Sequence, residues 1–524
     1  MADYVIAGSG INALVAASLL ALKGRKVLVL ERNPVIGGCI RSEEATVPGF
    51  THDVMATTFV LFLLSPAYAA LGPELEKRGL QFAHPEIPTG VLRPGGSHLL
   101  LRKDRPANIE AFDALAEGDG AQYAADMERL GADAPFLFAL LGGKLWSWGM
   151  AKLVAGEAWR RGPRALSAFF GEALGSARHW LEPHYKSDLF HALLAPWVLH
   201  TGLGPESSYS GQMAKVIAFA LESAGAPIVK GGAQNILTAF ERLIADHGGE
   251  IRTNADVAEV IVDEAGRATG VMLASGEKIM AAEGVICSMT PGQLYGRLLK
   301  SFPGVEAQRA ETRGFVHGKA NMQIHYALKS APQWHDPELG KVALLHLTTG
   351  LDGVSKAVNE AERGMLPVEP TICLGQPTAF DPSRAPDGKA ILWLQLPEAP
   401  RHIKGDAAGE IAAPADGLWT DAVREAYADR VEKILSRHIP DFASLVLGRR
   451  CYSPADLEAM NVNLVGGDPY GGACTIDQFF LWRPLRGSVN HETPVKRLYY
   501  IGASTHPGPG LGGGSGFLLA SALR

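Results

Sequence analysis

The first 31 residues carry the pattern that most narrowly restricts the fold. A short apolar run, Tyr4–Ala7, leads into a G-x-G-x-x-A turn at residues 8–13, and Leu14–Leu22 continues with helical periodicity. Lys26–Leu30 is a second apolar run, and Glu31 stands at its carboxyl end. Strand, glycine turn, helix, strand and acid in this order make the βαβ unit that binds a dinucleotide. The sequence therefore predicts an α/β fold of the Rossmann type.

Each residue of this unit has a mechanical reason to be there. Gly8 permits the tight turn, and Gly10 lets a pyrophosphate approach the helix N-terminus because it has no Cβ atom. Ala13 is small enough for the helix to pack on the strand. Glu31 is placed to accept hydrogen bonds from both ribose hydroxyls, and its carboxylate would repel a 2′-phosphate. FAD or NAD is therefore expected in preference to NADP.

Two further glycine-rich segments favour FAD over NAD. The pair Gly37–Gly38 follows Glu31 closely and would let the backbone pass close to an extended cofactor. Near the other end of the chain, the apolar run Arg497–Ile501 precedes a loop with seven glycines in residues 502–516, and Phe517–Leu523 then continues as an apolar helix. The start of that helix is predicted to point at the pyrimidine edge of a flavin, where negative charge develops on reduction.

Six segments together resemble the phytoene-desaturase-like branch of the FAD-dependent amine oxidase and desaturase superfamily. Within that branch, the resemblance is to the group that contains the pyridine nucleotide-disulfide oxidoreductase domain-containing protein 2. The matching segments are GSGINALVAA (8–17), ERNPVIGG (31–38), PGFTHD (48–53), VKGGAQNI (229–236), GDPYGGACTIDQFFLWRP (467–484) and YYIGASTHPGPGLGGGSG (499–516). Ala13 departs from the glycine that is common in the family, and the difference is conservative.

The resemblance implies a Rossmann-like FAD-binding domain interwoven with an α+β substrate domain, which contains a mixed sheet and helices. The expected boundaries are 1–53, 226–289 and 466–524 for the FAD-binding domain, and 54–225 and 290–465 for the substrate-binding domain. Within the latter, strand-like runs occur at 321–328 and 390–396, and an amphipathic helix at 421–438. Because the chain passes repeatedly between the two domains, the active site is expected at their interface.

The FAD contacts expected from these segments are spread over the whole chain, and the backbone of Val257 is carried over from related flavoproteins as a contact to the adenine. They are Gly8, Gly10, Ile11, Asn12, Ala13, Glu31, Arg32, Gly37, Gly38, Cys39, Arg41, Val257, Ser288, Gly502, Ala503, Ser504, Leu511, Gly512 and Gly513. Cys39 beside the flavin is either a covalent attachment point or a small packing residue, and packing is the favoured interpretation.

Three residues are candidates for acid–base chemistry. His52 and Asp53 come just after the second glycine motif, and His506 lies within the carboxyl-terminal flavin loop. A dehydrogenation needs a substrate carbon over flavin N5 and, in some reactions, a base for the second proton. The alternative for each of the three is structural, as a side chain that bonds to loop backbone.

The expected function is dehydrogenation of a largely apolar small molecule by hydride transfer to flavin N5. It would form a carbon–carbon double bond or oxidise a C–N or C–O bond. One alternative is a flavin-dependent, redox-neutral double-bond isomerase, and another is a non-catalytic flavoprotein that serves as an interaction module. No second complete G-x-G-x-x-G–acid unit and no C-x-x-C pair is present, so neither an NAD(P)H domain nor disulfide reductase chemistry is expected. Oxygen or a quinone is the expected electron acceptor.

Composition limits partners and location. The five cysteines are scattered, which argues against a zinc site or a disulfide framework and fits a reducing, cytoplasmic compartment. A net charge of −6 gives no indication of nucleic-acid binding. Two apolar stretches, Thr57–Leu64 and Phe136–Phe170, are predicted to be buried helices of the substrate domain. The alternative for both is peripheral membrane contact or a passage for a lipid-like substrate.

Overall fold

The amino-terminal pattern forms the centre of a seven-stranded sheet. In the computed structural model, which describes residues 1–523, its strands are β1 (Ala2–Ala7), β2 (Val27–Leu30), β9 (Glu250–Arg252), β10 (Val257–Val262), β11 (Ala268–Leu273), β12 (Lys278–Ser288) and β20 (Leu498–Ile501). Five of them run parallel in the order β20–β12–β1–β2–β9. The hairpin β10–β11 extends the sheet antiparallel to the first half of β12. This is the Rossmann-like arrangement that the sequence predicts.

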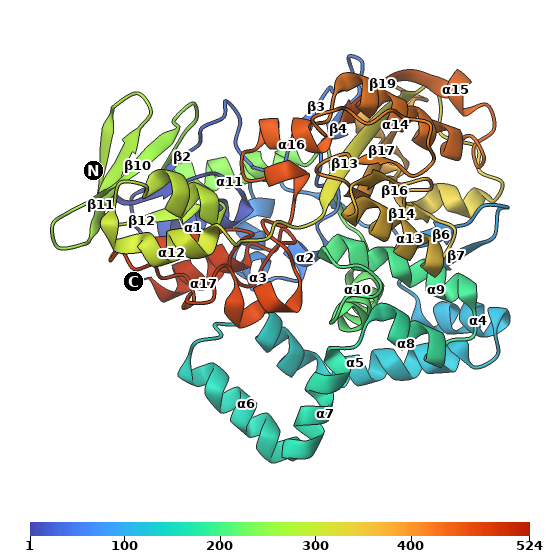
Figure 1. Ribbon diagram of the computed structural model, residues 1–524, viewed down its shortest axis with the longest axis horizontal. Coiled ribbons are helices and arrows are strands. Elements are labelled where there is room, and N and C mark those ends of the chain that lie inside the picture. Colours follow the sequence, from blue (N-terminus) through green and yellow to red (C-terminus); the bar gives the residue numbers. More distant parts are fainter. Residues whose placement is uncertain (524) are drawn as a thin grey trace.

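Four helices cover one face of this sheet and enclose its core. They are α1 (Ile11–Leu22), α3 (Pro66–Glu76), α11 (Gln234–Asp246) and α17 (Gly514–Ala522). Helix α1 ends where Gly24 adopts a left-handed φ of +79°. Helices α1 and α17 lie side by side although nearly 500 residues separate them (Figure 1). They approach so closely that a Cβ on Gly516 would come within 1.9 Å of the Asn12 carbonyl oxygen.

A second seven-stranded sheet lies beside the first (Figure 1). Its strands are β6 (Ile87–Leu92), β7 (His98–Leu101), β13 (Ala320–Leu328), β14 (Val342–Leu347), β16 (Ile372–Gly375), β17 (Ala390–Ala399) and β19 (Val446–Tyr452). Their order is β19–β13–β17–β16–β14–β6–β7, with β14 and β6 parallel and the other pairs antiparallel. Met322, Ile324 and Tyr326 of β13 face a core shared with helix α14 (Asp421–Leu435). The alternate residues of β13 therefore face the opposite side.

Helices pack against this opposite face of the second sheet. They are α4 (Arg105–Leu115), α5 (Asp119–Gly142), α8 (Ala177–His184), α9 (Asp188–Leu194), the 3₁₀ helix η1 (Ala195–Thr201), α10 (Ser210–Ala224) and α13 (Leu351–Glu362). The two sheets draw their strands from alternating parts of the chain, as the predicted interwoven fold requires. Helix α3 packs on the first sheet although its residues follow position 53, so the predicted domain boundaries stay a prediction.

The expectation of buried helices for Phe136–Phe170 is correct only in part. Phe136, Leu137 and Leu166 are buried, but the helix in the middle of this stretch is not. Helix α6 (Trp148–Arg161) has no buried residue, and with α7 (Pro163–Ala173) it projects away from the rest of the molecule (Figure 1). Trp148 is 83% exposed and Trp159 is 93% exposed. The expectation fails for α6 because aromatic content was taken as a sign of a core, whereas Lys and Arg between the aromatics leave α6 without a continuous apolar face. Thr57–Leu64 contains the short helix α2 (Val60–Leu63), of which Phe62 is buried.

Candidate functional site

A cavity of about 430 Å³ opens at the carboxyl ends of the parallel strands and continues to the second sheet. Four neighbouring parallel strands end beside the cavity, and each contributes a residue to the cavity wall. These are Gly8 after β1, Glu31 after β2, Ser288 at the end of β12 and Gly502 after β20. The carboxyl edge of a parallel sheet is where doubly wound folds bind their ligands. The position and size of the cavity are therefore those of a small-molecule site.

The glycines of the first turn leave a cradle at the N-terminus of α1. Gly10 has extended backbone angles, and a Cβ placed on it would meet no protein atom within 4 Å. No side chain caps this helix end, so its backbone N–H groups are available to a ligand. Gly8 has a φ of +96°, and a Cβ on it would lie 2.7 Å from the Ser288 carbonyl oxygen. The space beside Gly10 thus suits an anionic pyrophosphate.

The second glycine motif is pressed against the first. Gly37 forms a backbone bridge with Gly10 and has a φ of +111°. A Cβ on Gly38 would lie 3.3 Å from the Gly10 Cα atom. Side chains at these positions would separate the two loops, which explains why a glycine pair follows the acid at the end of β2.

The Glu31 carboxylate is fixed by the loops around it. One oxygen accepts hydrogen bonds from the Ser9 hydroxyl (2.6 Å) and backbone N–H (3.1 Å), and the other accepts from the Asn33 backbone N–H (2.9 Å). The side chain is buried and borders the cavity. A carboxylate oxygen can accept more than one hydrogen bond, so the carboxylate retains capacity for ribose hydroxyls.

Hydrogen bonds connect the carboxyl-terminal glycine loop to the first glycine turn and to Arg483, which precedes the loop in sequence. The Ser515 hydroxyl donates to Asn12 Oδ1 (2.8 Å) and accepts from the Gly502 N–H (3.0 Å). The buried guanidinium of Arg483 donates to the carbonyl oxygens of Tyr470 (2.7 Å) and Ala503 (2.8 Å). These contacts hold the loop against the cavity wall.

Most of the predicted FAD contacts border this cavity. They are Gly8, Gly10, Ile11, Asn12, Glu31, Arg32, Gly37, Gly38, Cys39, Val257, Ser288, Gly502, Ala503, Ser504 and Leu511. Ala13, Arg41, Gly512 and Gly513 do not: Ala13 lies on the buried face of α1, and Arg41 pairs with Glu43. A Cβ on Gly513 would lie 2.6 Å from Val15, so this glycine serves helix packing. Burial raises the pKa of the Cys39 thiol to about 12, and a thiol that stays protonated suits packing.

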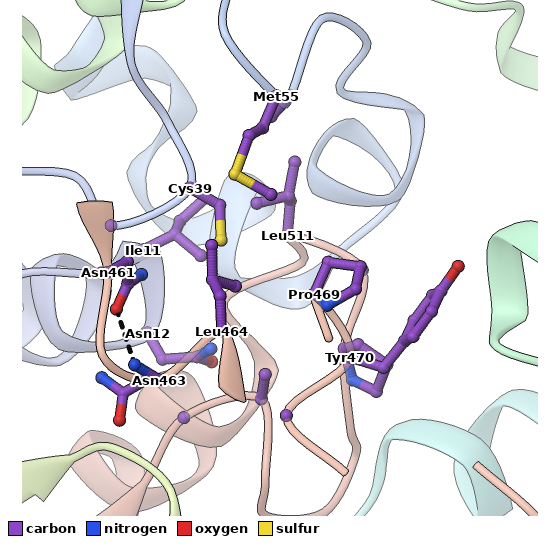
Figure 2. A pocket seen from close by; sticks show the side chains of 18 of the residues that line it. Ile11, Asn12, Cys39, Met55, Asn461, Asn463, Leu464, Pro469, Tyr470 and Leu511 are labelled. Carbon is purple, nitrogen blue, oxygen red and sulfur yellow. Dashed lines mark hydrogen bonds between the residues drawn. The ribbon is translucent and has the colours of Figure 1, made fainter. Parts of the chain in front are cut away.

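One segment of the cavity wall was not predicted from the sequence. Asn461, Asn463 and Leu464 lie between α16 (Pro454–Met460) and the loop that carries Pro469 and Tyr470, and Figure 2 shows them around Ile11, Asn12 and Cys39. Asn463 Oδ1 accepts a hydrogen bond from the Thr290 N–H (2.9 Å). The two asparagines immediately before the GDPYGG motif were the available signal.

The three residues predicted for acid–base chemistry are not brought to this cavity. His52 is fully buried and hydrogen-bonded to the Thr46 hydroxyl (2.8 Å), and burial lowers its pKa to about 2. The His506 ring bonds to the Gly143 carbonyl (2.9 Å), and burial lowers its pKa to about 4. Asp53 is fully buried and pairs with Arg384 (2.6 Å). None of the three borders the cavity, which favours the structural alternative for each.

The Asp53–Arg384 pair gives a direct test of that alternative. Asp53→Asn should lower the free energy of unfolding by about 3 kcal/mol, because it leaves part of a buried guanidinium charge uncompensated. Turnover per bound flavin should stay within twofold of the wild type. The control is Glu369→Gln, which removes a half-exposed partner of Arg437 and should cost about 0–1 kcal/mol. A stable Asp53→Asn protein with turnover reduced 100-fold would restore Asp53 as a catalytic residue.

The part of the cavity that faces the second sheet is largely apolar. Met55, Trp197, Ile217, Leu344 and Trp393 are among its lining residues. His200 also lines it, and its Nε2 atom is 3.0 Å from Nε2 of His346 behind it. With Cys373, these two histidines bring metal-ligating atoms within 4.8 Å of one another. The two imidazoles share a hydrogen bond through their Nε2 atoms, and burial lowers the pKa of His200 to about 4, which keeps the ring neutral at pH 7.

The site as a whole fits FAD. The uncapped helix end beside Gly10 suits the pyrophosphate, and Glu31 suits the ribose. Beyond them, the cavity continues past Ser288 and the carboxyl-terminal glycine loop to the apolar wall. The fold and this site define an FAD-dependent oxidoreductase.

Comparison with known proteins identifies the family. The model of the family described as "Flavin containing amine oxidoreductase" matches residues 14–445, and the chain belongs to this family. The rat pyridine nucleotide-disulfide oxidoreductase domain-containing protein 2 is 29% identical over 98% of this chain and 92% of its own length. A limonene dehydrogenase chain of Castellaniella defragrans is 25% identical, covering 99% and 94%. The phytoene desaturase of Cereibacter sphaeroides is 25% identical, covering 97% and 92%.

A solved structure confirms the fold. An oxidoreductase from Methanosarcina mazei superimposes with a TM-score of 0.61 at 15% identity, covering 99% of this chain and 100% of its own. The resemblance to the phytoene-desaturase-like branch and the FAD cofactor predicted from the sequence are thereby confirmed.

Proposed function

We propose that this enzyme dehydrogenates a largely apolar small molecule, with the substrate held between the cofactor and the second sheet. When bound, FAD supplies a hydride acceptor at N5. The observation that carries the proposal is the continuity of one cavity from the dinucleotide motif at Gly10 to the apolar wall around Trp393. Two relatives, a limonene dehydrogenase and a phytoene desaturase, are named for apolar isoprenoids.

The residues of this wall exclude water and orient the substrate rather than transfer protons. Trp393 Nε1 donates to the Met55 carbonyl oxygen (3.1 Å), and the Tyr470 hydroxyl donates to the Leu199 carbonyl oxygen (2.6 Å). Both polar groups are thereby turned away from the substrate. An apolar, water-poor wall favours transfer of hydride from a C–H bond, because no solvent competes for the reacting centre.

The test is anaerobic titration of the holoenzyme with amines, alcohols, isoprenoids and unsaturated lipids. Bleaching of the flavin absorption by one class, with a product two hydrogens lighter, is expected. A product isomer of unchanged mass, formed without net flavin reduction, would replace this proposal with the redox-neutral isomerase. No reduction and no product from any class would remove the dehydrogenase proposal. Reoxidation of the bleached enzyme by oxygen or by a quinone would then identify the electron acceptor.

We also propose that α6 and α7 rest on a membrane surface. Trp148, Lys152 and Trp159 follow one another at helical spacing on the exposed face of α6, with Lys144 and Arg164 close in sequence. Tryptophan beside lysine and arginine is the composition of segments that lie at an anionic bilayer surface. No helix within residues 1–523 is long and apolar enough to cross a membrane. The contact would be peripheral and would place the enzyme beside apolar substrates.

Flotation with vesicles of 30% anionic lipid (roughly the charge needed for polybasic attraction) tests the contact. The double variant Trp148→Ser/Trp159→Ser should bind at least about tenfold more weakly, because two large aromatic side chains no longer enter the interface. Leu418→Ser, which alters another exposed apolar residue outside these helices, is the matched control and should bind like the wild type. Equal binding of the double variant and the wild type would contradict the proposal.

A further inference from the structure

A row of polar side chains crosses the cavity-facing side of the second sheet. Gln323 of β13 lies opposite Gln395 of β17, Gln395 lies opposite Cys373 of β16, and Cys373 lies opposite His346 of β14. Since neighbouring strands are in register here, these four side chains lie in one line across the sheet. A purely hydrocarbon substrate gives no reason for such a row.

Two of the four members of this row already have a hydrogen-bond partner. His346 is hydrogen-bonded to His200, as described above. Gln395 donates to the side-chain oxygen of Asn321 (2.5 Å), in the orientation of the asparagine amide that gives partners to both its nitrogen and its oxygen. The Gln395 amide nitrogen and His346 Nε2 therefore do not need a ligand, and His346, whose Nδ1 atom has no hydrogen-bond partner within residues 1–523, does not border the cavity.

Gln323 differs from its neighbours. Its side chain is fully buried and lines the cavity, yet neither its amide nitrogen nor its amide oxygen makes a hydrogen bond within residues 1–523. A buried amide with no partner is strongly unfavourable, and such groups are rare in folded proteins. The tryptophan indoles of this wall, at Trp393 and Trp197, are both paired with protein oxygens. This amide lies at the edge of a ligand cavity with both its donor and its acceptor unpaired. A bound ligand would supply the missing hydrogen-bond partners.

The charge of the group that Gln323 would meet follows from its surroundings. Around it, the second sheet and η1 contribute Gln395, Leu344, Trp393, Trp197, His200 and Thr201 to the wall, and none of these is an aspartate, glutamate, lysine or arginine. The His200 imidazole is neutral at pH 7, because burial lowers its pKa. A charged substrate group would lose its hydration here without gaining a counter-ion, so a neutral group is favoured.

We propose that Gln323 binds a neutral oxygen function, a carbonyl or a hydroxyl, on an otherwise apolar substrate. This inference rests on the proposed dehydrogenase function and names its substrate class. The amide N–H₂ can donate to a carbonyl oxygen, and the amide oxygen can accept from a hydroxyl. The enzyme would thus prefer oxygenated apolar molecules over hydrocarbons of the same skeleton, and it would discriminate against protonated amines.

The test uses the holoenzyme and isoprenoid hydrocarbons matched with the alcohol and ketone of the same skeleton. Binding is followed by thermal shift and by perturbation of the flavin spectrum, and turnover by anaerobic flavin reduction. The wild type should bind the oxygenated member at least about tenfold more tightly. Gln323→Met, which keeps the volume and removes the amide, should lose about 10- to 100-fold in affinity for the oxygenated member. Its affinity for the hydrocarbon should be unchanged, and its KM should change more than its kcat.

Two further readouts keep the test independent of folding and of the proposed chemistry. Gln323→Met should melt at a temperature equal to or above that of the wild type, because the variant no longer buries an unpaired amide. Gln376→Met, the matched control, removes a buried glutamine that does not border the cavity and that pairs with Trp334 (2.9 Å) and the Leu339 carbonyl oxygen (2.8 Å); it should melt at a lower temperature without a change in oxygenate preference. Failure of every compound to reduce the flavin would remove the dehydrogenase, whereas a preserved binding preference would still support Gln323.

Three results would overturn the inference. The first is equal affinity of the wild type for both members of every pair. The second is an unchanged preference in Gln323→Met. The third is a change in FAD affinity or in the flavin spectrum of substrate-free Gln323→Met, which would assign the amide to the cofactor instead of the substrate.

Discussion

The Gly516→Ala variant is expected to lose FAD. A Cβ at this position would lie 1.9 Å from the carbonyl oxygen of Asn12, so α1 and α17 would have to separate by roughly 1.5 Å to restore ordinary contact. Asn12 borders the cavity and is tied to Ser515, so the separation distorts the turn that receives the pyrophosphate. We expect destabilisation by about 3 kcal/mol and at least tenfold weaker FAD binding. The melting temperature and the ratio of FAD to purified protein measure the two effects.

Gly156→Ala is the matched control for that variant. Gly156 is also helical, but it is exposed on α6, and a Cβ there would meet no atom within 4 Å. Its replacement should be neutral or stabilise by about 0.5–1 kcal/mol, because alanine favours a helix. A Gly516→Ala protein with wild-type FAD content and melting temperature would show that α1 and α17 do not need this close approach.

Gly10→Val should separate folding from cofactor binding. Gly10 has a φ of −64° and a ψ of 166°, which valine adopts readily, and the space beside its Cα contains no protein atom within 4 Å of an added Cβ. The variant should therefore fold, with an apoprotein melting temperature close to that of the wild-type apoprotein. The valine side chain would fill the place of the pyrophosphate, and FAD affinity should fall about 100-fold or more.

A graded series makes this result specific. Gly10→Ala adds one methyl group and should weaken FAD binding less than valine does, with the same unchanged apoprotein stability. Gly8→Ala should behave differently, since Gly8 has a φ of +96° and its Cβ would lie 2.7 Å from the Ser288 carbonyl oxygen. Instability is therefore expected for Gly8→Ala even without cofactor. Wild-type FAD affinity in Gly10→Val would mean that the cofactor does not pass the N-terminus of α1.

The dinucleotide-binding half of the molecule could be predicted because each of its motifs lies within one short stretch of the sequence. Gly8, Gly10 and Glu31 fall within one βαβ unit, and the glycine loop after β20 has its own strand and helix. The βαβ unit alone predicts the sheet and a dinucleotide, and the two further glycine-rich segments favour FAD. The flavin-binding role of each residue stays a prediction until it is measured.

The substrate half was not predictable in the same way. Gln323 and Trp393 lie in apolar runs that correctly indicate strands, but their meeting at one cavity depends on the pairing of β13 with β17. His52 and His506 were chosen for their nearness in sequence to flavin motifs. In the structure their rings bond to Thr46 and Gly143, away from the cavity, because a loop that passes near a cofactor can still turn its side chains outward.

The contact between α1 and α17 has a consequence for biosynthesis. A ribosome synthesises α1 nearly 500 residues before its partner helix α17. During translation the apolar face of α1 therefore lacks one of the surfaces that cover it, and contacts so distant in sequence form slowly. FAD is expected to load after translation, and chaperones that shield the nascent amino-terminal unit should raise the yield of holoenzyme.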